Sequence, residues 1–240
     1  MTTAPAPTLV LWDIDRTLLY VGDFDRQVYR EAFADVVGRP ATVFPARGTG
    51  MTMPLAIQGF LRDNGVAEED IADFTRRMIE QLPTRLSGHR AAIRERGILL
   101  PGAVEALRAV HERPDLIPTV VTGNLRSSAL IKLTTLGLDR FLDADLGGYS
   151  SDDPHRPALV AIAQRNAHRR HGTVFTRANT VIIGDSLEDV RTGIEGGARV
   201  IGVASGTTTP EQLTRAGADI VLPDLKDVPG LMAAIASGGA

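Results

Sequence analysis

The sequence predicts an α/β protein, in which a doubly wound parallel sheet carries an inserted α-helical domain. From residue 101 onward, short apolar runs alternate with segments of helical periodicity, which is typical of a Rossmann-like parallel sheet with helices on both faces. A similar apolar run at residues 9–12 has no partner nearby in the sequence, and residues 20–99 have helical periodicity throughout. We therefore predict a core of residues 1–19 and 100–240 and a helical domain of residues 20–99.

Each element is predicted from its own pattern. Four consecutive apolar residues at 9–12 indicate a strand covered on both faces. Apolar residues at helical spacing predict three helices in the insertion, over residues 24–38, 53–65 and 71–82, the last ending before Pro83. The helices expected after Pro101 are 102–112, 126–136, 156–169 and a short one from Glu188. The strands expected there are 117–121, one near 144–148, 180–183, 200–203 and 220–222.

Composition excludes several classes of function. With 26 basic and 29 acidic residues in 240, the chain has no global field that would attract nucleic acid or a membrane surface. The absence of cysteine excludes disulfides, thiolate nucleophiles and Cys-ligated metals. Residues 1–8 do not resemble a signal peptide, and no apolar run is long enough to span a bilayer. We expect a cytoplasmic protein.

Acidic residues follow two predicted strands at the point where each strand ends. Asp13 and Asp15 come directly after the first strand, and Asp185 and Asp189 follow the strand over 180–183. The carboxyl ends of parallel strands lie at one edge of a sheet, where these carboxylates would repel one another unless a cation joined them. Mg²⁺ prefers such oxygen ligands, which Asp13 and Asp185 can supply. A carboxylate beside Mg²⁺ can also act as a nucleophile toward phosphorus.

Groups suited to phosphate binding follow two other strands. Thr122, Gly123 and Asn124 lie between the strand over 117–121 and the next helix, and Arg156 begins a later helix. The Thr122 hydroxyl, the backbone N–H groups around Gly123 and Asn124, and the Arg156 guanidinium can hold phosphate oxygens. We therefore predict a small phosphorylated metabolite as the substrate.

At these residues the sequence resembles the haloacid dehalogenase-like superfamily, and the resemblance covers almost the whole chain. Its four motifs match Asp13-x-Asp15-x-Thr17, Thr122, Arg156-Pro157 and Gly184-Asp185-x-x-x-Asp189. The helical insertion resembles the family's type-one cap domain. The pattern Thr122-Gly123-Asn124 looks like the phosphoglycolate phosphatase-like branch. The resemblance implies an enzyme, a phosphatase that uses Mg²⁺ to hydrolyse a small phosphomonoester through an aspartyl-phosphate.

The resemblance also implies a role for each matched residue. Asp13 would be the nucleophile and a Mg²⁺ ligand. Asp15 would protonate the leaving alkoxide, activate water for dephosphorylation and bind Mg²⁺ through its backbone carbonyl. Asp185 would be a direct metal ligand, and Asp189 would orient metal-bound water. Thr122 would bind phosphate.

Two positions depart from the family pattern. Many members have glycine where Arg16 stands, so Arg16 either alters the loop beside the nucleophile or projects into solvent. The third motif is usually Lys-Pro, whereas this chain has Arg156-Pro157 and contains two lysines, Lys132 and Lys226. We expect Arg156 to be the phosphate-binding cation and Lys132 to be a helix-surface residue. Lys132 remains the alternative cation.

Other functions share parts of this pattern. A haloalkanoate dehalogenase would also use Asp13, but its relatives need no Mg²⁺ and lack the counterpart of Asp15. A sugar-phosphate mutase shares the core and differs in its cap chemistry, while a receiver-like signalling module has no helical insertion and usually has lysine where Arg156 stands. Four polar residues of the first motif loop and the insertion are candidates to contact the leaving group: Tyr20, Arg26, Arg47 and His89.

Overall fold

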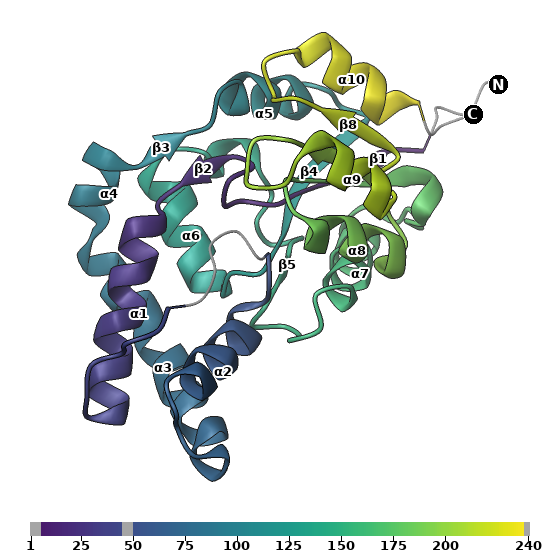
Figure 1. Cartoon of the computed structure of the whole chain (residues 1–240). Helices are drawn as coiled ribbons and strands as arrows, with labels where there is room; N and C mark the ends of the chain where they lie inside the picture. The colour runs from purple at the N-terminus through teal and green to yellow at the C-terminus, as the bar shows by residue number, and fades with distance from the viewer. Residues whose placement is uncertain (1–5, 45–49, 238–240) are drawn as a thin grey trace, which may run out of the picture.

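A parallel sheet of six strands forms the centre of the computed structural model, which describes residues 6–44 and 50–237. The strands, in spatial order, are β5 (Gly148–Tyr149), β4 (Leu116–Thr122), β1 (Thr8–Trp12), β6 (Thr180–Gly184), β7 (Arg199–Val203) and β8 (Ile220–Leu222). The chain builds outward from β1, first toward β5 and then toward β8 (Figure 1). The strand order therefore reverses beside β1, and the predicted doubly wound sheet is confirmed.

Helices cover both faces of the sheet. One face packs with α5 (Ala103–His111), α6 (Arg126–Thr135) and α10 (Val228–Ala236), and the other with α7 (Ala158–His171), α8 (Leu187–Gly196) and α9 (Pro210–Ala216). Along β1, Val10 and Trp12 pack against the helices on the first face, and Leu9 and Leu11 pack against those on the second. Burial of both faces explains why residues 9–12 are apolar without alternation.

The helical insertion begins and ends at one place. Strand β2 (Leu19–Tyr20) pairs antiparallel with β3 (Ile98–Leu99), and the helices lie between them in the sequence. These helices are α1 (Gly22–Val37), α2 (Met53–Asp63), α3 (Glu68–Gly88) and α4 (Arg90–Arg96). In Figure 1 they lie along the left side and the bottom of the view, and α3 packs against α1, α2 and the core helix α6. The insertion thus forms one helical layer beside the carboxyl edge of the sheet.

Several element ends differ from the prediction by two or more residues, and the end of α3, the start of β5 and the start of α7 are three of them. Helix α3 continues through Pro83 to Gly88 because Leu82 and Leu86 carry its buried face onward, and this packing outweighs the hydrogen bond that proline removes. Strand β5 starts at Gly148 rather than near residue 144, since a turn precedes it in which the Asp145 N–H donates to the Asp143 carboxylate (3.1 Å). The helix expected at 156–169 begins at Ala158. The short elements β2, β3, α4, α9 and α10 were not predicted.

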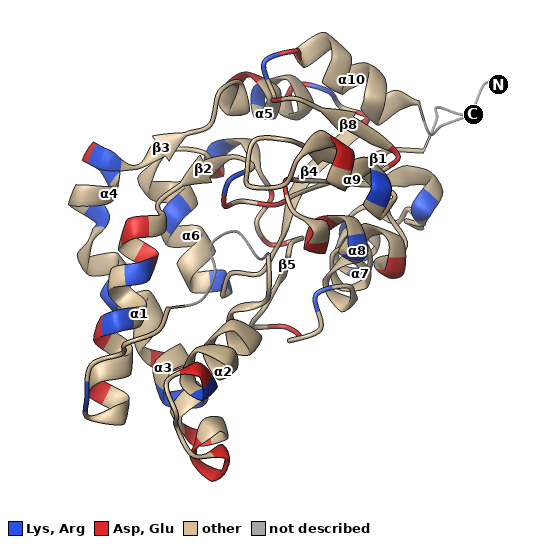
Figure 2. Ribbon diagram, in the orientation of Figure 1, with Lys and Arg blue, Asp and Glu red and all other residues tan. Residues whose placement is uncertain are grey.

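Charged residues of both signs are mixed over the surface. Figure 2 shows basic and acidic segments alternating on α1 and α3, and exposed pairs such as Arg76 with Glu80 (3.0 Å) join them. The basic residues in the last turn of α7 are exposed beside the helix C-terminus, where positive charge is favourable. Among the described helices, none combines the length and apolar character that crossing a membrane requires.

Candidate active site

Three neighbouring strands deliver polar side chains to the carboxyl edge of the sheet. Asp13 follows β1, Thr122 ends β4 and Asp185 follows β6. The Asp13 N–H donates to the carbonyl of Ile183 (2.9 Å), which continues the strand ladder as far as the site. All three polar side chains are buried. They lie where the strand order reverses, the place at which open α/β sheets bind ligands.

Asp13, Asp185 and Asp189 form a buried acidic cluster. Each offers a carboxylate oxygen within 4.8 Å of the others. Asp189 lies in the first turn of α8, where its carboxylate accepts hydrogen bonds from the Ser186 N–H (2.9 Å) and hydroxyl (2.6 Å). The Thr17 hydroxyl donates to Asp185 (3.1 Å). Helix capping and the first motif loop therefore fix two of the three carboxylates.

Arg156 is the cation of this cluster. Its side chain is buried, and Nη2 donates to Asp13 Oδ1 (2.8 Å) and to Asp189 Oδ1, while Nη1 donates to the carbonyl of Gly50. Burial alone would lower the pKa of Arg156. The Asp189 and Asp13 carboxylates raise it by more than burial lowers it, so the pKa of Arg156 lies above its usual value. The guanidinium is charged and bridges two carboxylates.

The donor set fits a divalent cation. With all three carboxylates ionised, the single guanidinium would leave two negative charges unbalanced in a buried place. Burial, followed by the charge of Asp189, raises the pKa of Asp13 well above its usual range and that of Asp185 to about 7. These carboxylates resist ionisation without more positive charge nearby, and oxygen donors of this kind are the ligands that hard divalent ions prefer. The cluster is therefore chemically suited to hold a metal ion.

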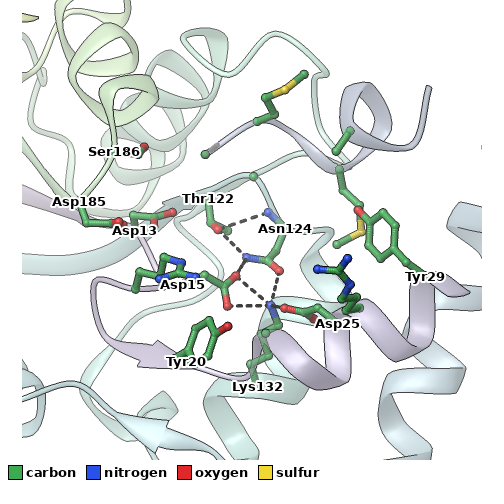
Figure 3. Close-up of a pocket in the computed structure, with 18 of the residues that line it drawn as sticks. Asp13, Asp15, Tyr20, Asp25, Tyr29, Thr122, Asn124, Lys132, Asp185 and Ser186 are labelled. Atoms are coloured by element: carbon green, nitrogen blue, oxygen red, sulfur yellow. Dashed lines mark hydrogen bonds and ion pairs between the residues drawn. The ribbon is translucent and has the colours of Figure 1, made fainter. Parts of the chain in front are cut away.

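A second buried cation, Lys132, lies on the other side of the pocket (Figure 3). Its Nζ donates to both oxygens of Asp15 (2.9 and 2.8 Å), to Asp25 Oδ2 (2.8 Å) and to Asn124 Oδ1 (2.9 Å). The expectation of a surface lysine is wrong, because α6 is buried between the core and the insertion and Lys132 is 1% exposed. Lys132 contacts Asp15, whereas Arg156 contacts Asp13.

The loop after β4 connects the two clusters. The Thr122 hydroxyl accepts hydrogen bonds from the backbone N–H (3.3 Å) and side-chain amide (2.9 Å) of Asn124. The same amide donates to Asp15 (2.7 Å). At Gly123, a Cβ atom would lie 2.4 Å from the carbonyl oxygen of Met51, so the insertion approaches this loop too closely for any side chain.

A cavity of about 230 Å³ connects both clusters and is lined by the core and the insertion together. Its walls on the insertion side come from α1, the segment after it and the start of α2, and include Asp25, Arg26, Tyr29, Phe44, Met53 and Ala56. Besides the Arg156 contact with the Gly50 carbonyl, two hydrogen bonds hold the start of α2 and the segment before it against the core: the Met53 N–H donates to the Gly123 carbonyl (2.8 Å), and the Thr52 hydroxyl donates to the Pro154 carbonyl (2.7 Å). The pocket is therefore a joint product of both parts.

Arg16 takes the conformation that glycine would supply at its position. With φ = 66°, it is the one non-glycine residue in the left-handed region among those that the structure describes. Its guanidinium lies 4.6 Å from the centre of the Tyr20 ring, and both residues line the cavity. Of the two alternatives for Arg16, the structure favours a loop residue beside Asp13 and the cavity over a side chain directed into solvent.

The remaining candidates of the insertion lie in different places. Arg26 lines the cavity, with its guanidinium 4.4 Å from the centre of the Phe44 ring. His89 lies at the junction of α3 and α4, packs against the Phe24 ring at 5.8 Å and is not among the residues lining the cavity. Arg47 lies outside the described residues. Sequence patterns missed Asp25, whose carboxylate contacts Lys132 from α1.

This fold, with a buried acidic cluster where its strand order reverses, has the arrangement of an α/β enzyme that binds its ligand at that edge. The family model of haloacid dehalogenase-like hydrolases matches residues 10–193, and the chain belongs to that family.

Individual relatives are distant in sequence. Pyrophosphatase PpaX of Listeria monocytogenes is 25% identical over 193 residues, which cover 74% of this chain and 85% of that protein. A hydrolase from Pseudomonas syringae has a similar crystal structure, with a TM-score of 0.68 and 23% identity over 96% of this chain and 99% of that one. CbbY from Rhodobacter sphaeroides, solved in complex with phosphate, matches with a TM-score of 0.66 and 22% identity over 92% and 96%. The two structures share the fold described above.

Proposed function

We propose that this protein is a Mg²⁺-dependent phosphatase that hydrolyses a small phosphomonoester through an aspartyl-phosphate on Asp13. The observation that carries the proposal is the Asp13 carboxylate, which is buried at the strand reversal, paired with Arg156 and grouped with two further carboxylates. PpaX is named a pyrophosphatase, an activity that also transfers a phosphoryl group to water, and CbbY was solved in complex with phosphate; both agree with phosphoryl-transfer chemistry. The sequence Thr122-Gly123-Asn124 favours the phosphoglycolate phosphatase-like branch of the family.

In the first step, an Asp13 carboxylate oxygen attacks phosphorus and the bond between phosphorus and the leaving oxygen breaks. Asp15 lines the same cavity and gives its proton to the leaving oxygen. Thr122, Gly123, Asn124 and Arg156 line the same cavity. Thr122, the backbone at Gly123 and the Arg156 guanidinium stabilise the charge that develops on the phosphoryl oxygens, while the donors of Asn124 hold Thr122 and Asp15 in place. The product is an acyl phosphate on Asp13 and a free alcohol.

In the second step, Asp15 takes a proton from water as the water oxygen attacks phosphorus. The bond between phosphorus and the Asp13 oxygen breaks, which regenerates the carboxylate and releases inorganic phosphate. Asp15 thus acts first as acid and then as base, as one group can when leaving group and water occupy the same side of phosphorus. Both steps use the same pocket.

Mg²⁺ would be held by the carboxylates of Asp13 and Asp185, by the backbone carbonyl of Asp15 and through water by Asp189. When bound, it supplies positive charge that balances the acidic cluster and polarises the phosphoryl group. Residues 20–99 act in this proposal as a cap domain on a core of residues 1–19 and 100–240, excluding bulk water from the pocket. A cavity of about 230 Å³ favours a small phosphorylated metabolite.

The test is a phosphate-release screen of small phosphomonoesters, with inorganic pyrophosphate included, at several Mg²⁺ concentrations and with excess chelator. We expect release that requires Mg²⁺ and is absent from the Asp13→Asn variant. Halide release from haloalkanoates without Mg²⁺ would instead identify a dehalogenase. Isomerisation of a sugar phosphate without phosphate release would identify a mutase, and a stable phosphoprotein after treatment with acetyl phosphate would identify a receiver-like module.

A further inference from the structure

Lys132 is a buried cation that the proposed chemistry leaves without a task. Its ammonium group has three N–H donors, and three groups accept them: the carboxylates of Asp15 and Asp25 and the side-chain oxygen of Asn124. Figure 3 shows these partners converging on Nζ. Because its donors are used, Lys132 has none left to bind a phosphate oxygen. Its function must therefore lie in the groups that it holds.

The first of these groups is Asp15, the proposed acid and base. Its carboxylate contacts Lys132 through both oxygens and accepts a further hydrogen bond from the Asn124 amide (2.7 Å). The Asn124 amide cannot exchange its oxygen and nitrogen positions by a 180° flip, because its oxygen accepts a hydrogen bond from Lys132 and its nitrogen also donates one to Thr122. These contacts lock the orientation of the Asp15 side chain, which keeps 32% of its surface exposed.

The second group, Asp25, comes from the insertion. It lies in the first turn of α1, where the positive end of the helix dipole favours its negative charge. Its contact with Lys132 (2.8 Å) links the insertion to the core helix α6 directly beside Asp15. Lys132 thus has one carboxylate partner that is proposed to react and one that belongs to the insertion.

We propose that Lys132 is a positioning residue that orients the Asp15 carboxyl for proton transfer, and that Asp25 makes this orientation depend on the placement of α1. The inference rests on the proposed function, in which Asp15 protonates the leaving oxygen. In this arrangement, the position of α1 relative to the core and the orientation of the Asp15 carboxyl are coupled. Lys132 itself makes no contact with substrate.

The test measures how strongly the first step depends on the leaving group. Phenyl phosphate and p-nitrophenyl phosphate differ little in shape, but phenoxide is the more basic leaving group and gains more from protonation. Single-turnover release of the two phenols isolates the first step, because the second step is common to both substrates. We expect Lys132→Met to slow phenyl phosphate by ~10²-fold and p-nitrophenyl phosphate by less than ~10-fold, within the range of general acid catalysis.

Asp25→Asn keeps an oxygen acceptor for Lys132 but loses its charge, so we expect the ratio of the two rates to shift in the same direction by roughly 3–10-fold. The matched control is Asp35→Asn, the same change on the same helix, at a side chain that is 58% exposed and paired with Arg85. It should leave the ratio unchanged. Asp15→Asn provides the limiting ratio for a pocket without an acid.

A variant that is merely destabilised slows both substrates equally. If Lys132→Met and Asp25→Asn each slow phenyl phosphate and p-nitrophenyl phosphate by the same factor, the inference is overturned and the proposed function stands. If circular dichroism shows that Lys132→Met does not fold, the ratio in Asp25→Asn decides. A wild type that releases neither phenol in the presence of Mg²⁺ overturns the proposed function, and the inference with it.

Discussion

Two buried cations divide the pocket between them. Arg156 and Lys132 are each 2% exposed or less, and each contacts two carboxylates. The partners of Arg156 follow β1 and begin α8, so its carboxylates belong entirely to the core. Those of Lys132 come from the first motif loop and from α1, so its contacts join the core to the insertion. Similar electrostatics thus support different tasks.

The difference follows from the geometry of the two cations. A guanidinium is a planar fork that can bridge carboxylates and still present donors to a phosphoryl group, whereas an ammonium is a compact point charge with three donors. At Lys132 all three donors are used by protein groups. Both cations are buried and have carboxylate partners. Their proposed roles differ because Arg156 contacts the proposed nucleophile, Asp13, whereas Lys132 contacts the proposed acid, Asp15.

The largest effect is expected where the cation's partner is the nucleophile. Asp13→Asn keeps the side-chain volume but removes the proposed nucleophile, so activity should fall by at least ~10³-fold. Asp25→Asn, the same change at a partner of Lys132, should reduce steady-state turnover by less than ~10-fold. Phosphate release under saturating Mg²⁺ measures both. Equal losses in the two variants would remove the distinction between the two cations.

Arg156→Ala is the next test. Loss of a donor that stabilises transition-state charge typically costs about 2.7–4 kcal/mol, so kcat/KM should fall by ~10²–10³-fold. Arg156→Lys should recover part of this, because an ammonium restores the charge but not the planar fork. Steady-state kinetics with one substrate suffices. Near-normal activity in Arg156→Ala would show that the core cation does not serve the phosphoryl group.

The metal requirement should distinguish the same two regions. Asp185→Ala removes a carboxylate from the acidic cluster, and we expect the Mg²⁺ concentration for half-maximal stabilisation against heat to rise by at least ~10-fold. Asp25→Asn should leave it unchanged, since Asp25 is outside that cluster. Thermal unfolding across a Mg²⁺ titration gives the comparison. An unchanged titration in Asp185→Ala would contradict its assignment as a ligand.

The smallest effect concerns pH and stability in the Lys132 region. Burial raises the pKa of Asp25 to about 6, so between pH 4 and 6 the folded protein binds more protons than the unfolded chain. The free energy of unfolding therefore decreases as pH rises through this window. Between pH 4.5 and pH 7, the free energy of unfolding should decrease by roughly 1–2 kcal/mol more in the wild type than in Asp25→Asn. Denaturant titrations at both pH values, without metal, measure this difference, and parallel curves would contradict it.

The sequence predicts the core better than the Lys132 region for a physical reason. Strands buried on both faces leave continuous apolar runs, and the acidic residues that follow them mark their carboxyl ends. Lys132 left a weaker signal, a single lysine inside the apolar stretch 129–133, which is also compatible with a lysine on a helix surface. Asp25 left none, because it lies among charged neighbours on an amphipathic helix. Which member of such a charged face turns inward depends on tertiary packing.

The β2–β3 pair has a consequence for how such proteins diversify. Because Tyr20 lies opposite Ile98, the helices between them leave and rejoin the core at adjacent positions. Evolution, or an engineer, can lengthen, shorten or exchange this segment without altering the order of strands in the sheet. In this protein the segment also brings the Asp25 carboxylate to Lys132, a contact that an exchanged segment without a carboxylate there would lose. The contacts that the core offers at this place, such as the one from Lys132, therefore influence which inserted segments are compatible with it.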